Sequence, residues 1–208
     1  MNIWKNYALR LSAVGSYRSF LVLPPVQALA KLIRALAEET ADDEALLDHY
    51  AETFYALQKA GYDSLGGYLW EHFRYDETPY GDAAARGTAN AALVDAARWD
   101  VETFAALSAV TPAQWRAAVA RRAGEEAAAL LPVWRADDTL SFEVLTEEYR
   151  KNGAGEFARY KAFTWSNHTL LRVVDPDLEE HALIGYEEER KEVQDNTRAL
   201  LAGHSVNN

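Results

Sequence analysis

The sequence contains no cysteine and only one methionine among its 208 residues. The lack of cysteine excludes disulfide bridges, thiolate metal ligands and a cysteine nucleophile. Basic residues are also scarce, because 21 lysines and arginines stand against 32 aspartates and glutamates, and the net charge is -11. Such an acidic chain disfavours binding to nucleic acids or to anionic membranes, which require a basic surface.

Long apolar runs are missing as well. The run from Phe20 to Leu23 is followed directly by two prolines, whereas a membrane-spanning helix needs about 20 apolar residues. The first residues also lack the continuous apolar stretch and the small-residue cleavage site of a signal peptide. We therefore expect a cytoplasmic protein with no membrane partner.

The residues that are present are those of a folded, helical protein. Hydrophobic residues make up 49% of the chain and aromatic residues 12%, which is enough to build a core. Apolar residues recur at spacings of three and four through most of the chain, the period of a helix. The predicted helical segments are 24–36, 40–60, 63–75, 93–104, 112–131, 142–152 and 186–201.

Several residues mark the expected ends of these helices. Thr40 is predicted to be an N-cap, and Thr111 to Gln114 form a capping box with a proline at the first helical position. The helix that follows is expected to continue to Leu131, where Pro132 ends it. The segment 76–87 contains one proline and two glycines, so we expect a long loop there.

The last third of the chain differs in character from the rest. Residues 164–165 and 169–174 resemble a small β-hairpin around Ser166 and Asn167. The polar stretch 135–138 marks a candidate boundary. We therefore predict a mainly α protein, with a helical bundle over residues 1–136 and a small α+β linker over residues 137–208 that holds the hairpin and a C-terminal helix.

Known catalytic and metal-binding motifs do not occur. No glycine precedes a lysine, as a P-loop requires, and the glycine pair at 153 and 155 follows a helix rather than a strand. The five histidines are scattered, and Glu71-His72 lacks the second histidine of a zinc helix. We predict no catalytic residue and no metal site in this chain.

A basic and aromatic stretch over residues 149–165 could in isolation bind nucleic acid, with bases stacked on its rings. Its basic residues are Arg150, Lys151, Arg159 and Lys161, and its aromatic residues are Tyr149, Phe157, Tyr160, Phe163 and Trp165. Aromatic residues at helical and strand spacing usually face inward. We therefore expect a small core with basic side chains around it, and keep a nucleic-acid adaptor as an alternative.

Two segments resemble a family of uncharacterised bacterial AAA+-type ATP-binding proteins that carries a domain-of-unknown-function label. Residues 145–165, LTEEYRKNGAGEFARYKAFTW, resemble the family pattern xxYxxxGxGxFAxYxAFxW. Residues 183–187 (LIGYE), 196–203 (NTRALLAG) and 206–208 (VNN) resemble the pattern LxGYExxxxxxxxNTxxFLAGxxxNN. The resemblance covers about the last 70 residues, and Leu200 stands where the family usually has phenylalanine.

The resemblance implies that this chain is the N-terminal part of a longer protein. In the family, the double asparagine leads into a buried strand and the Walker A loop, so the sequence would stop just before both. Ile184, Gly185 and Tyr186 would then line the adenine side of a nucleotide pocket in the full-length protein, which would bind ATP and magnesium. The partners implied are the protein's own AAA+ core in cis and an unidentified protein.

The resulting hypothesis is a non-catalytic, partner-recognising N-terminal module of an AAA+-type ATPase. The alternative is a complete small helical enzyme with an unrecognised site near Glu71 and His72. A stop codon directly after Asn208 would favour that alternative, whereas a glycine-rich loop with Gly-Lys-Ser or Gly-Lys-Thr would exclude it.

Overall fold

The structure is a computed structural model that describes residues 2–38, 42–174 and 185–203. Contacts divide the chain into two units, residues 1–172 and 173–208, and each is described by itself. The first unit contains α1 (Ile3–Ser12), the 3-10 helix η1 (Arg18–Val22), α2 (Pro24–Ala37), α3 (Asp43–Lys59), α4 (Leu65–Tyr75), α5 (Pro79–Ala85), α6 (Ala91–Ser108), α7 (Pro112–Ala123), α8 (Glu125–Leu130), α9 (Phe142–Asn152), α10 (Glu156–Arg159), β1 (Phe163–Ser166) and β2 (Thr169–Arg172). The described part of the second unit contains α11 (Glu187–Leu201).

The predicted fold class is confirmed, because the described residues are mainly helical with one two-stranded hairpin and a C-terminal helix. Residues 137–172, which we assigned to the linker, share the first compact unit with the helical bundle. The division between bundle and linker at residue 136 stays a prediction.

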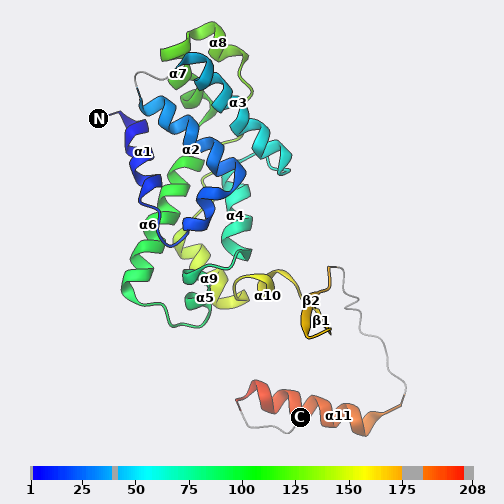
Figure 1. Ribbon diagram of the computed structural model, residues 1–208. Helices are drawn as coiled ribbons and strands as arrows, with labels where there is room; N and C mark the ends of the chain where they lie inside the picture. Colours follow the sequence, from blue (N-terminus) through cyan, green and yellow to red (C-terminus); the bar gives the residue numbers. More distant parts are fainter. Residues whose placement is uncertain (1, 39–41, 175–184, 204–208) are drawn as a thin grey trace. The chain divides into compact units, whose positions relative to one another are not determined.

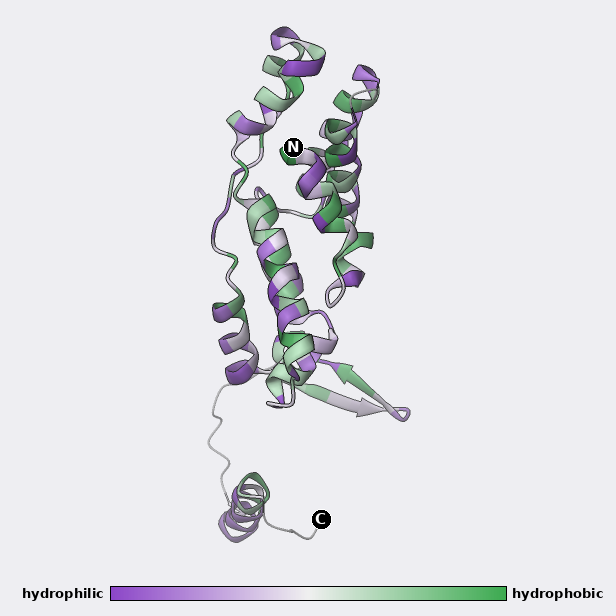
Figure 2. Ribbon diagram, turned by 90° about the vertical axis from the view of Figure 1, so that its left-hand side faces the viewer, coloured by the Kyte–Doolittle hydropathy of each residue, from purple (hydrophilic) through white to green (hydrophobic). Residues whose placement is uncertain are grey.

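The helices of the first unit are amphipathic and enclose an aromatic core. In Figure 1, α7 and α8 lie at one end of this unit and α5, α9 and α10 at the other. Figure 2 shows hydrophobic and hydrophilic residues alternating around each helix, as burial of one face requires. The largest fully buried side chains include Trp115, Tyr17, Tyr50, Tyr80, Tyr149, Phe20, Phe73 and Phe104.

The capping box at the start of α7 is confirmed. The Thr111 hydroxyl accepts a hydrogen bond from the Gln114 backbone N–H at 3.3 Å, and the Gln114 side chain accepts one from the Thr111 N–H at 2.8 Å. The predicted continuation to Leu131 was wrong. Gly124, with φ +89°, separates α7 from α8, because this backbone conformation lies outside the helical region.

Two further predictions about local structure were wrong. The N-cap of α3 is Asp42, whose carboxylate accepts from the Glu44 N–H at 3.2 Å, whereas Thr40 lies outside the described residues. The predicted loop over 76–87 contains α5, because Thr78 caps that helix and Pro79 occupies its first turn. The glycine that suggested a loop, Gly81, instead lets α5 approach α9 closely.

The predicted hairpin is confirmed, with its turn one residue later than expected. Asn167 and His168 have φ angles of +48° and +60°, the left-handed conformation of a two-residue turn whose twist matches that of paired strands. The pairing places Phe163 opposite Arg172 and Trp165 opposite Leu170. Because side chains alternate along a strand, these four residues share one face of the hairpin.

Candidate functional site

The residues predicted to border adenine lie at the start of α11. Gly185 and Tyr186 have φ angles of +90° and +61°, and they form a tight turn directly before the helix. The Tyr186 side chain is 75% exposed. Ile184 lies outside the described residues, so the structure describes only Gly185 and Tyr186 of the three predicted residues.

The charges around this turn suit a neutral ring better than a phosphate. Glu187, Glu188 and Glu189 occupy the first turn of α11, where carboxylates offset the positive end of the helix dipole and repel an anion. The Tyr186 ring next to them offers a flat apolar surface. The arrangement could therefore border a base, whereas the phosphates would have to be held by other groups.

Helix α11 has no buried residue among those described. Its apolar side chains Val193, Leu200 and Leu201 are 65%, 58% and 83% exposed. In Figure 2, the hydrophobic residues of α11 lie on one side of the helix and the hydrophilic residues on the other. An amphipathic helix normally buries such an apolar side against another surface.

Glu71 and His72, the residues of the enzyme alternative, both lie in α4 and have structural partners. Glu71 pairs with Arg159 of α10 at 3.1 Å, and His72 Nδ1 lies 2.8 Å from the Asp76 carboxylate. Within the described ranges, no group of three or more histidine, aspartate or glutamate residues could hold a metal ion. Both residues therefore have structural partners, and neither belongs to a metal-binding group among the residues that the structure describes.

A groove of about 480 Å³ lies between α5, α6 and α9. Its apolar floor includes Val94 and Phe142, and the Tyr80 hydroxyl hydrogen-bonds Thr146 at 2.8 Å along one wall. The Arg98 guanidinium lies 4.3 Å from the centre of the Phe142 ring and pairs with Glu143. An apolar floor with charged groups at its rim suits a side chain of another protein.

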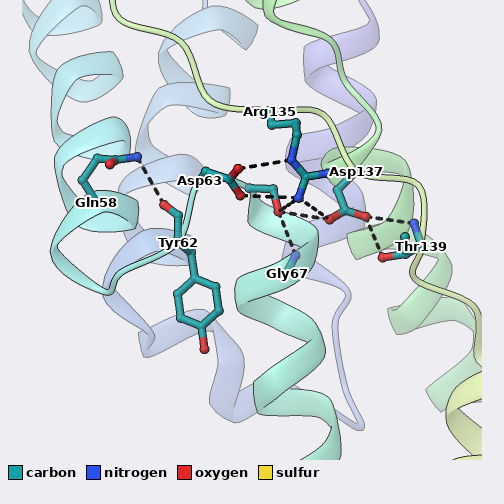
Figure 3. A network of polar contacts seen from close by, with 8 residues as sticks. Gln58, Tyr62, Asp63, Gly67, Arg135, Asp137 and Thr139 are labelled. Atoms are coloured by element: carbon teal, nitrogen blue, oxygen red, sulfur yellow. Dashed lines mark hydrogen bonds and ion pairs between the residues drawn. The ribbon is translucent and has the colours of Figure 1, made fainter.

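A buried polar network ties the segment after α8 to the start of α4 (Figure 3). The Asp137 carboxylate accepts hydrogen bonds from the Ser64 hydroxyl at 3.0 Å and from the Thr139 N–H at 3.0 Å. Burial raises the pKa of Asp137, but the hydrogen bonds from Thr139 and Ser64 and the nearby Arg135 guanidinium outweigh it, so the pKa lies below its usual value. This network is structural, and it lies in the stretch where the sequence suggested a domain boundary.

Close packing beside this network leads to a prediction. A Cβ atom at Gly66 would lie 2.7 Å from the Cβ and Cγ atoms of Asp137, so Gly66→Ala should lower the free energy of unfolding by about 2 kcal/mol. Urea denaturation followed by circular dichroism would measure this change. Gly15→Ala is the matched control, because the nearest atom lies 4.0 Å away, and this variant should keep wild-type stability. Equal stability of the two variants would contradict the packing described.

The helix α9 is held in the first unit by buried hydroxyl groups. The Tyr149 hydroxyl donates to the Phe73 carbonyl and lies 3.2 Å from the Tyr17 hydroxyl. Burial raises the pKa of both tyrosines well above the usual value, so both stay protonated at neutral pH. These contacts fix the place from which α10 and the hairpin continue.

Comparison with protein-family models, with curated proteins and with solved structures finds no match to this chain. None of the described helices has both the length and the apolar character that crossing a membrane requires. The class that the fold itself defines is a mainly helical protein with one antiparallel hairpin.

Proposed function

We propose that this chain is a non-catalytic, partner-recognising module at the N-terminus of an AAA+-type ATPase. The observation that carries the proposal is the resemblance of residues 145–165 and 183–208 to that family, with matching order and spacing. ATP hydrolysis would be carried out by an ATPase core that follows in the longer protein and binds ATP and magnesium.

The described part of the second unit supports this proposal. Gly185 and Tyr186 form a turn with an exposed ring, and the acidic first turn of α11 suits the base rather than the phosphates of ATP. The exposed apolar side of α11 is what we expect of a helix that packs against a further domain. Both features agree with a helix that borders a nucleotide pocket without forming one alone.

The partner-recognising role is assigned to the helical unit. The groove between α5, α6 and α9 offers both an apolar floor and ionic groups at its rim. One wall of it is α9, which belongs to the predicted linker but packs against α4, α5 and α6. A partner that binds this groove would thereby contact the segment leading toward the ATPase core, which is one way to couple the two sites.

This division of roles predicts different nucleotide binding by the chain and by the longer protein. Isothermal titration of the chain alone with ATP and magnesium should show no binding at micromolar affinity. The chain extended by its natural downstream residues should bind, and Tyr186→Ala in that protein should weaken binding about tenfold, as expected for loss of base stacking. Tyr55→Ala is the control, because Tyr55 is 63% exposed on α3, in the other unit.

Micromolar binding of ATP by the chain alone would contradict the proposal, as would a stop codon after Asn208.

To find the partner, the full chain should be used as bait, with Arg98→Ala as a variant of the groove rim. A specific partner of the module should be retained by the wild-type chain and lost by the variant.

A further inference from the structure

The surface formed by α10 and the hairpin exposes large aromatic side chains. Phe157 and Trp165 are 70% and 66% exposed, whereas Tyr149, at the start of the same stretch, is fully buried. The expectation that this stretch faces inward is therefore wrong for two of its five aromatic residues. The reason is that a short helix and a two-stranded hairpin present few side chains with which to cover each other.

Four aromatic residues of this stretch and two residues of the second strand together make a surface that we call the hairpin face. It consists of Phe157, Tyr160, Phe163, Trp165, Leu170 and Arg172. The Phe157 and Phe163 rings lie 4.9 Å apart, and the Arg172 guanidinium lies 5.4 Å from the centre of the Tyr160 ring. Register places Phe163, Trp165, Leu170 and Arg172 on the same side of the hairpin.

The charge of this region is opposite to that of the whole chain. Residues 150–172 contain five basic residues and one acidic residue, which gives a local charge of +4 in a chain of net charge -11. Lys161 is exposed, and no ion pair to it occurs in the described part of the chain. The negative charge of the protein is thus carried by other segments.

Two of the basic residues are held by exposed ion pairs. Arg172 pairs with Glu156 at 2.7 Å, and Arg159 pairs with Glu71 at 3.1 Å. Exposed pairs of this kind contribute little to stability, so a phosphate group could replace either carboxylate. Glu156 is the one acidic residue within 150–172, so its removal would leave Arg172 free to bind an anion.

We propose that the hairpin face binds single-stranded nucleic acid, a function beyond the module described above. Bases stack on the exposed faces of Trp165 and Phe157, and phosphates contact Arg172 of this face and the basic residues Arg159 and Lys161, which adjoin Tyr160 in the sequence. Exposed aromatic rings interleaved with cations are the combination by which proteins bind single strands without sequence preference. An acidic peptide would satisfy the cations alone and would leave the flat rings unused, and a duplex has no unpaired bases to stack.

The test uses the full chain and a fluorescently labelled 20-nucleotide oligo(dT), with binding followed by anisotropy at low salt. The wild-type chain should bind, and affinity should fall with salt with a log–log slope of about -2 for three phosphate contacts. Trp165→Ala should weaken binding about tenfold, and Phe157→Ala should have a similar effect. Lys161→Ala should make the salt slope shallower by about 0.7.

The most specific expected result is a gain of affinity. Glu156→Gln should strengthen binding several-fold, because it removes a repelling carboxylate and releases Arg172. Trp99→Ala is the matched control, since Trp99 is 46% exposed on α6, far from the hairpin face in sequence, and its loss should leave binding unchanged.

Three results would overturn the proposal. They are no binding of oligo(dT) at low salt, equal binding by wild type and Trp165→Ala, and displacement of oligo(dT) by polyglutamate at equal charge concentration. The last would identify the surface as a site for acidic polypeptides. Circular dichroism of each variant verifies that the fold is intact, which we expect because the substituted side chains are exposed.

Discussion

Trp115→Ala is expected to lower the free energy of unfolding by about 4 kcal/mol. The Trp115 side chain is 1% exposed, and its ring lies 4.7 Å from that of Trp4 and 5.5 Å from that of Trp134. It therefore joins α1 and α7 to the segment that follows α8. The indole Nε1 makes no hydrogen bond in the described part of the chain, so the expected loss comes from packing and from the cavity left behind.

Chemical denaturation followed by circular dichroism measures this loss. Trp165→Ala is the matched control, because the same substitution at a side chain that is 66% exposed should change stability by less than about 0.5 kcal/mol. A loss below about 1 kcal/mol at Trp115 would show that this part of the core is not packed as described.

Asp100→Ala is expected to lower the free energy of unfolding by about 3 kcal/mol, the second largest loss of stability that we expect. Asp100 is 1% exposed on α6, and its carboxylate accepts hydrogen bonds from the N–H groups of Gly15 at 3.1 Å and Tyr17 at 2.9 Å. Removal leaves these backbone donors without their acceptor in a buried place. Asp95→Ala, at an exposed position on the same helix, is the control and should be nearly neutral.

The same carboxyl predicts a pH dependence. Burial raises the pKa of Asp100, and the hydrogen bonds from Tyr17 and Gly15 offset only part of the rise. The folded protein then binds this proton more tightly than the unfolded chain, so the contribution of Asp100 to stability falls as the pH rises above about 4. Asp100→Asn cannot titrate, so the stability advantage of wild type over this variant should shrink over that range. A constant difference would contradict the raised pKa.

Local features of the fold were predictable because their signals lie close together in the sequence. The capping box at Thr111 and Gln114 and the apolar stripe of α2 specify helices through residues a few positions apart. The hairpin follows from two strand-like segments with a short polar turn between them. Such local signals failed for α5, which the sequence did not predict. Gly81 suggests a loop as long as its packing against α9 is unknown.

The candidate sites were less predictable. Sequence resemblance pointed to Gly185 and Tyr186, and the structure adds the left-handed turn and the exposed ring. The groove between α5, α6 and α9 could not be derived from the sequence, because its residues come from segments up to 70 positions apart. The polar network at Asp137 was missed for the same reason, since Ser64 is 73 residues away.

The sequence by itself determined the class of this protein: an acidic, cysteine-free, mainly helical chain with one hairpin, followed in the sequence by a C-terminal helix. Only the tertiary structure decided that Asp100 and Asp137 are buried, and that Trp115 is covered while Trp165 is exposed. The physical reason is that helix periodicity and capping depend on neighbours in the chain. Burial depends on which distant segments pack together, and residue type alone does not specify that.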